Sequence, residues 1–150
     1  MLNVADSCPS FSLEDQDGNV VTTADLKGKN VVFYFYPKDN TPGCTIEGQE
    51  FSSLLDAFNA KNTLVFGISK DSVKKHNGFC NKFAFKHSLL SDPEGVLCQA
   101  FGVWQQKSMF GKKYMGIVRA TFLVDTDGTI TNVWPTVKVK GHALDVLDTI

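Results

Sequence analysis

The 150-residue chain has few cysteines, a single arginine and no long apolar run. Its longest apolar stretch, residues 31–36, is far too short to span a bilayer, so we expect no membrane association. The first residues do not resemble a secretory signal, which makes the cytoplasm, where thiols stay reduced, the default expectation. Scattered lysines and a net charge of -1 give no electrostatic footprint for binding nucleic acid.

The four cysteines are too sparse and too widely spaced to form a disulfide scaffold or a zinc ribbon. They stand at Cys8, Cys44, Cys80 and Cys98, and no two share a CxxC pattern. His76 is one helical turn before Cys80, but without a second pair of ligands we expect no metal site. Each cysteine is therefore either a buried apolar residue or a reactive thiol, and its sequence context has to decide which.

The order of the predicted elements indicates one α/β domain spanning residues 1–150, a sandwich with a mixed central sheet. An N-terminal β-hairpin is expected over residues 11–23, and the apolar run 31–36 is typical of a strand buried on both faces. Further strands are expected at 64–68, 89–90, 118–124 and 129–134. Helices are expected from Thr45 through Phe58 and over 72–85, 93–101 and 141–150. The polar segment 105–116 is predicted to be a surface loop, and His142 to be solvated.

Cys44 has the most informative context of the four cysteines. The buried strand 31–36 is followed by Pro37 and a dense loop, and Cys44 falls at the start of the next helix. Unpaired N–H groups and the positive end of the helix dipole favour a thiolate over a thiol there. Thr41 is close enough in sequence to aim its hydroxyl at the same sulfur. A purely structural buried cysteine is the alternative, but ligand sites of α/β proteins form where a strand passes into a helix.

Arg119 is the only arginine among 15 basic residues, and it interrupts the apolar segment 117–124. A lysine would serve as well on an exposed surface, whereas a guanidinium stays charged when partly buried and offers several fixed donors. We therefore expect Arg119 to lie beside the Cys44 thiolate. A structural ion pair or an exposed edge position is the alternative.

These residues resemble a known family. The pattern formed by Pro37, Thr41 and Cys44 is similar to the P-x-x-x-[TS]-x-x-C motif of peroxiredoxins, and TPGCTIE looks like the peroxiredoxin Q (bacterioferritin comigratory protein) branch. The segments LLSDPEG and RATFLVDTDG extend the resemblance over most of the chain. It implies a thioredoxin-like fold and a hydroperoxide substrate, with Cys44 as the peroxidatic cysteine and Pro37, Thr41 and Arg119 as its pocket. It implies no cofactor, and it favours a monomer.

The resemblance also bears on the thiol that would resolve oxidised Cys44. Many members of the branch carry a second cysteine five residues after the first, but here that position is Gln49. Cys80 lies 36 residues after Cys44, and this position resembles that of the resolving cysteine in the subtype that carries it on the following helix. The alternative is that Cys80 is a buried apolar residue without a redox role. Cys98 is expected in the core and Cys8 to be inert.

The resemblance implies that thioredoxin or a glutaredoxin reduces the resulting disulfide. A one-cysteine peroxidase and a redox-sensing or chaperone module remain alternatives.

Overall fold

The computed structural model describes all 150 residues as a seven-stranded mixed sheet with helices on both faces and one separate hairpin. The strand order is β2-β1-β5-β4-β3-β8-β9. The strands are β1 (Ser12–Asp15), β2 (Val20–Thr22), β3 (Asn30–Phe35), β4 (Thr63–Ser69), β5 (Ser88–Ser91), β8 (Ala120–Val124) and β9 (Ile130–Trp134). Strands β3, β4 and β5 are parallel, and the remaining pairs in the sheet are antiparallel. The expected thioredoxin-like α/β sandwich with a mixed sheet and an N-terminal hairpin is thus confirmed.

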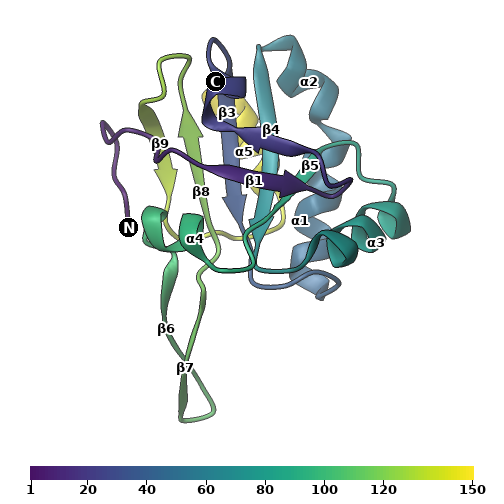
Figure 1. Cartoon of the computed structure of the whole chain (residues 1–150), viewed down its shortest axis with the longest axis vertical. Coiled ribbons are helices and arrows are strands. Elements are labelled where there is room, and N and C mark those ends of the chain that lie inside the picture. Colours follow the sequence, from purple (N-terminus) through teal and green to yellow (C-terminus); the bar gives the residue numbers. More distant parts are fainter.

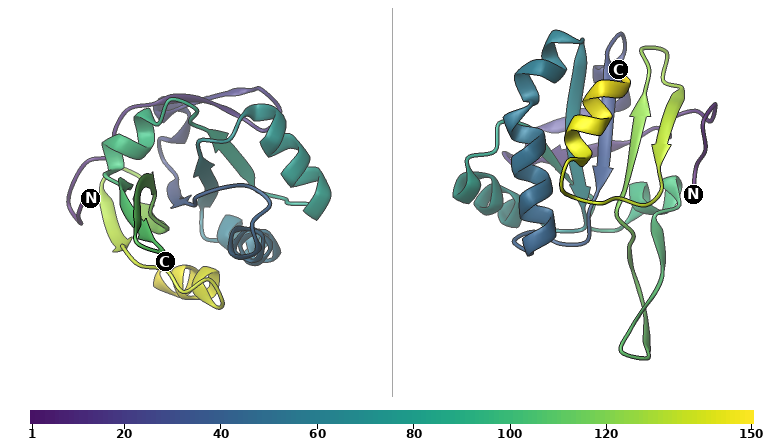
Figure 2. Two further views of the ribbon diagram at one scale, coloured as in Figure 1. Left: turned by 90° about the horizontal axis from the view of Figure 1, so that it is seen from below. Right: turned by 180° about the vertical axis from the view of Figure 1, so that it is seen from behind.

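The helices cover the sheet unequally. They are α1 (Pro42–Ser53), α2 (Leu55–Ala60), α3 (Val73–Phe83), α4 (Val96–Phe101) and α5 (His142–Thr149), with a 3-10 turn over Thr23–Leu26. One apolar cluster joins the sheet to α1, α2, α3 and α5, and the other joins its opposite face to α4 (Figure 2). None of these helices is both long and apolar enough to cross a membrane.

Strand β3 is buried on both faces of the sheet, because its side chains alternate between the two clusters. Phe33 and Phe35 pack on the α4 side, while Val32 and Tyr34 pack against the helices of the other face. This explains why the apolar run reads continuously rather than alternating with polar residues.

Residues 105–116 are not a loop, so that prediction is wrong. They form most of a two-stranded hairpin, β6 (Trp104–Met109) and β7 (Lys112–Ile117), outside the main sheet. Phe110 and Gly111 both have positive φ, which suits the tight two-residue turn between antiparallel strands. The hairpin buries no continuous apolar face, so its sequence lacks strand-like patterning. It projects from the end of the sheet at which β3 leads into α1 (Figures 1 and 2).

Candidate active site around Cys44

Cys44 is the third residue of α1 and is only 2% exposed. The helix begins at Pro42, three residues earlier than predicted, because proline suits the first helical position, where no intrahelical N–H bond is lost. Thr41 is the N-cap residue. The Cys44 sulfur therefore lies within the first turn of a twelve-residue helix, where the dipole is positive.

Arg119 lies directly beside that sulfur. Its Nη2 donates a hydrogen bond to Cys44 Sγ at 3.2 Å. The sheet accounts for this placement, because Ala120 on β8 pairs with Phe35 near the end of β3, and Arg119 therefore stands opposite the loop that leads to Cys44. Arg119 is not within a strand as predicted but in the connection between β7 and β8.

Glu47 is a member of the site that the sequence analysis missed. Its Oε1 accepts a 2.7 Å hydrogen bond from Arg119 Nη1, and the glutamate is 1% exposed. Burial raises the pKa of Glu47 to about 7, an effect that the nearby guanidinium only partly offsets and that Glu50 reinforces. Burial tends to lower the pKa of Arg119, but Glu47 and the Cys44 sulfur outweigh that effect and raise it, so Arg119 stays protonated. The three-residue spacing from Cys44 to Glu47, one face of a helix, was the available signal.

Gly43 makes room for the guanidinium. A Cβ atom at this position would lie 3.3 Å from Arg119 Nη2, tighter than an ordinary van der Waals contact. A side chain here would push the guanidinium away from its position between Cys44 and Glu47. The glycine is thus part of the geometry that brings Arg119 to the sulfur.

Neither Thr41 nor Pro37 forms a hydrogen bond with the sulfur. The Thr41 hydroxyl donates to the Lys38 carbonyl at 2.9 Å, so the expectation that it points its proton at Cys44 is wrong for this conformation. Its oxygen keeps lone pairs that can accept a proton from another group. Pro37 directly follows β3 and is exposed.

Cys80 lies on α3 and packs in the same apolar cluster as Cys44, although no disulfide joins them. Burial raises the pKa of Cys80 to about 12, with further contributions from Asp39, Asp17 and Asp15. In this conformation Cys80 is therefore a protonated thiol and a poor nucleophile.

The other two cysteines lie in the opposite cluster. Cys98 is fully buried in the core, as predicted, and burial raises the pKa of its thiol. Cys8 is partly buried against the same cluster, and burial raises its pKa to about 11. Neither thiol has the ionised character that reaction with an oxidant requires.

His142 is not solvated as predicted. It is 4% exposed, and its Nε2 forms a 2.7 Å hydrogen bond with the Thr121 hydroxyl. Burial lowers the pKa of His142 to about 4. Its imidazole ring packs edge-on against Phe51 and Trp134, so it serves to join α5 to the sheet and α1.

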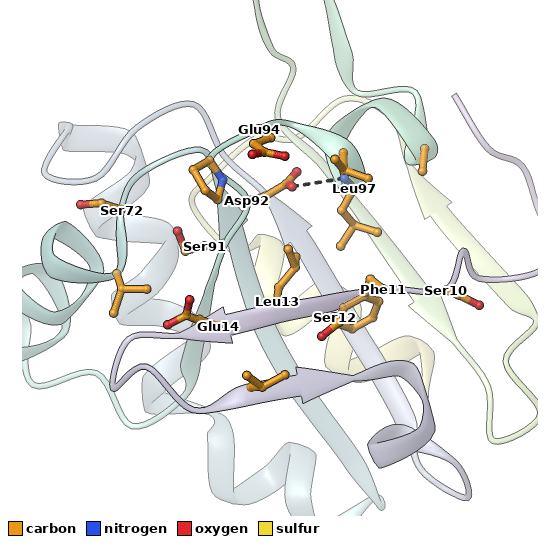
Figure 3. Close-up of a pocket in the computed structure, with 15 residues that line it drawn as sticks. Ser10, Phe11, Ser12, Leu13, Glu14, Ser72, Ser91, Asp92, Glu94 and Leu97 are labelled. Carbon is orange, nitrogen blue, oxygen red and sulfur yellow. Dashed lines mark hydrogen bonds between the residues drawn. The ribbon is translucent and has the colours of Figure 1, made fainter.

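A cavity of about 520 Å³ lies on the α4 side of the sheet, between β1 and the chain from Ser91 to Ala100 (Figure 3). Its apolar lining includes Phe11, Leu13, Val20, Val73, Val96 and Leu97. The lining contains neither Cys44 nor Arg119, so this cavity is separate from the site described above.

Comparisons with known proteins identify the family of this chain. Residues 4–133 match the model of the AhpC/TSA family. Peroxiredoxin Bcp of Bacillus subtilis is 42% identical over 99% of this chain and 95% of its own length, and Peroxiredoxin Bcp of Escherichia coli is 42% identical over 94% and 90%.

Solved structures show the same fold. A cysteine variant of Xylella fastidiosa PrxQ superposes with a TM-score of 0.94 at 40% identity, covering 99% of this chain and 95% of that one. The Xanthomonas campestris bacterioferritin comigratory protein gives a TM-score of 0.89 at 42% identity, covering 93% and 88%. The chain therefore belongs to the AhpC/TSA family, as a thiol-dependent peroxidase of the Bcp (peroxiredoxin Q) branch.

Proposed function

We propose that Cys44 reduces hydrogen peroxide and organic hydroperoxides, that Cys80 resolves the oxidised thiol, and that thioredoxin or a glutaredoxin recycles the disulfide. The observation that carries the proposal is the 3.2 Å hydrogen bond from Arg119 to the Cys44 sulfur at the first turn of α1. A fixed positive charge and a helix N-terminus both favour the thiolate, which is the nucleophilic form of cysteine.

In the proposed first step the Cys44 thiolate attacks the terminal oxygen of the hydroperoxide. An S–O bond forms and the O–O bond breaks, so the sulfur is oxidised to a sulfenic acid and the second oxygen leaves as hydroxide or alkoxide. That leaving group takes a proton and departs as water or an alcohol. Negative charge moves from sulfur towards the leaving oxygen, and the guanidinium of Arg119 is placed to stabilise it.

Thr41 and Pro37 complete the proposed pocket. Because the Thr41 hydroxyl donates its own proton to Lys38, its oxygen can accept the proton of the bound hydroperoxide. This interaction would orient the peroxide for attack along the O–O bond. Pro37 would limit the access of water and bulky groups to the thiolate.

Cys80 is the proposed resolving residue. Gln49 stands at the position of the alternative resolving cysteine, and Cys98 is in the cluster on the other face of the sheet. Because the Cys80 thiol is buried, the end of α3 has to open before this thiol can reach Cys44. Asn77, Gly78 and Asn81 have low helix propensity, which makes such opening less costly.

The finer properties of the protein follow from this cycle. An intramolecular disulfide requires no second subunit, so we propose a monomer. The cycle uses only thiols and an external dithiol carrier, so we propose a cofactor-free enzyme of the reducing cytoplasm.

Thiol counting with mass mapping tests the proposal. One equivalent of hydrogen peroxide should consume two thiols of the reduced protein and yield a peptide pair linking Cys44 to Cys80. Cys44→Ser should consume none, and the buried-thiol control Cys98→Ser should behave like the wild type. A sulfenic acid that persists as long in the wild type as in Cys80→Ser until thiol is added would favour a one-cysteine peroxidase. Slow, stoichiometric oxidation without turnover would favour a redox sensor.

A further inference from the structure

A buried pair of side chains joins the segment before Cys44 to the helix that carries Cys80. His76 Nδ1 and Asp39 Oδ2 are 2.7 Å apart, and their side chains are 0% and 2% exposed. Asp39 precedes Cys44 by five residues, and His76 precedes Cys80 by four. One hydrogen-bonded pair therefore lies within a few residues of both thiols, which are otherwise far apart in the sequence.

The surrounding hydrogen bonds hold this pair rigidly. The Tyr36 hydroxyl donates to Asp39 Oδ1 at 2.6 Å, and His76 Nε2 donates to the Leu90 carbonyl at 3.0 Å. The Asp39 N–H donates to Asp71 Oδ2 at 2.9 Å. Both carboxylate oxygens of Asp39 and both ring nitrogens of His76 thus have partners. A buried network without missing partners is costly to break, because each freed group would be left without water.

The helix after His76 has low intrinsic helix propensity, although its Phe79 packs in the core at 1% exposure. Asn77, Gly78 and Asn81 all follow His76, and the missing Cβ of Gly78 would meet no atom within 4 Å. Glycine in a helix interior costs stability relative to alanine, and no packing at this position offsets that loss. Backbone propensity therefore favours opening of α3 just beyond His76, in the segment that contains Cys80.

We propose that Asp39 and His76 are positioning residues: they stay bonded while residues 77–84 unwind, and so keep Cys80 within reach of oxidised Cys44. This inference rests on the proposed role of Cys80 as resolving cysteine. In that step the Cys80 sulfur attacks the Cys44 sulfur, an S–S bond forms and the S–O bond of the sulfenic acid breaks. The departing hydroxide and the proton of the Cys80 thiol leave together as water.

The expected slowing of disulfide formation follows from the number of unwound residues that connect Cys80 to the nearest anchored residue of α3, which we call the tether. Four extended residues after His76 let Cys80 travel at most about 14 Å from the anchor. Asn77 Nδ2 donates to the Gln16 carbonyl at 3.1 Å, but Asn77 belongs to the segment that unwinds. Without the pair, the next fixed point on the N-terminal side is the N-cap of α3, where the Ser72 hydroxyl accepts a bond from the Lys75 N–H at 3.2 Å. The tether to Cys80 then doubles from four residues to eight. Loop closure over twice the length is about threefold less probable.

Rapid-quench kinetics with one equivalent of hydrogen peroxide test this proposal. Sulfenic acid is trapped with a dimedone-type reagent, and the Cys44–Cys80 disulfide is quantified by mass mapping. In His76→Gln we expect sulfenic acid formation within about twofold of wild type and disulfide formation slowed about threefold or more. His87→Gln is the matched control, because His87 is also buried and bonded, to the Tyr34 hydroxyl at 2.6 Å, but lies outside α3.

Disulfide formation in His76→Gln as fast as in wild type or faster would overturn the proposal, as would equal slowing in His87→Gln, which would indicate general destabilisation. A wild type that forms no Cys44–Cys80 disulfide would instead refute the proposed function itself.

Gly78→Ala is a second test that does not depend on the folding of His76→Gln. The added methyl stabilises the helix after the anchor without a clash, so disulfide formation should slow by about fivefold. An unchanged rate would show that α3 does not unwind beyond His76, which would overturn the proposal.

Discussion

Arg119 donates one N–H to the Cys44 sulfur at 3.2 Å and another to Glu47 at 2.7 Å, although 75 residues separate Arg119 from Cys44. Cys44 and Glu47 lie one turn apart on α1, so a single guanidinium spans two groups on one helix face. The planar fork of arginine, with donors in fixed directions, suits this arrangement, whereas the single ammonium group of lysine does not.

Replacement of Arg119 should therefore impair the reaction with peroxide. In Arg119→Gln we expect the rate constant of Cys44 oxidation to fall by about 10²–10³, the effect of removing one preorganised donor from a site where charge develops. Arg119→Lys keeps the charge but not the planar fork of donors, so its rate constant should lie between those of Arg119→Gln and the wild type. Stopped-flow measurement of the first oxidation step gives the rates. A loss confined to the disulfide-forming step would contradict this role.

Gly43→Ala tests the space that the guanidinium needs. The new methyl group would lie about 3.3 Å from Arg119 Nη2 and displace it by a few tenths of an ångström. We expect the first oxidation step to slow several-fold, because small misplacements of catalytic groups are costly. Gly78→Ala is the control, because its methyl meets no atom and should leave this step unchanged. Equal rates of Cys44 oxidation in Gly43→Ala and Gly78→Ala would contradict a close contact between Gly43 and the guanidinium.

Glu47 should give the free energy of unfolding a distinct pH dependence. Its pKa is about 7 in the folded protein against about 4.5 when unfolded, so the folded state binds its proton more tightly. The stabilising contribution of Glu47 to the free energy of unfolding is fully present below about pH 4.5. As the pH rises through about 7 this contribution is lost, and the free energy of unfolding falls by about 3 kcal/mol at most. Denaturant unfolding of Glu47→Gln should lack this decline.

The difference between Glu47→Gln and the wild type isolates the effect. Burial lowers the pKa of His87 to about 3 and of His142 to about 4, so these residues destabilise the protein as the pH falls below about 6.5. That contribution is common to both proteins and cancels. A difference in unfolding free energy that does not change between pH 4 and pH 8 would contradict the shifted pKa of Glu47.

The sequence was most informative where local patterns and long-range packing agree. The run that becomes β3 is apolar because both its faces are covered, and its exit into a helix marks Cys44 without any structural information. Arg119 was identifiable from its rarity alone. Its exact element was not, because the strand boundary depends on pairing with β3 rather than on composition.

The missed features depend on contacts between distant segments. In the sequence Glu47 is indistinguishable from an exposed helix glutamate, because only the fold brings Arg119 beside it. His142 follows a glycine and appears solvated, because only the fold brings Thr121 and Trp134 against it. The Asp39–His76 pair joins two residues 37 positions apart. The β6–β7 hairpin pairs only with itself, so no buried face imposed an alternating pattern on its sequence.

Alkylation of Cys44 tests the account most directly. The measurement uses a variant in which Cys8, Cys80 and Cys98 are serine, compared with the same variant carrying Arg119→Gln. We predict that iodoacetamide alkylates Cys44 at pH 7 many times faster than it alkylates a free cysteine, and that loss of the guanidinium slows this reaction, because Arg119 donates to the sulfur at 3.2 Å. Alkylation no faster than that of free cysteine, or equally fast in both variants, would contradict the proposal that Arg119 and the start of α1 activate this sulfur.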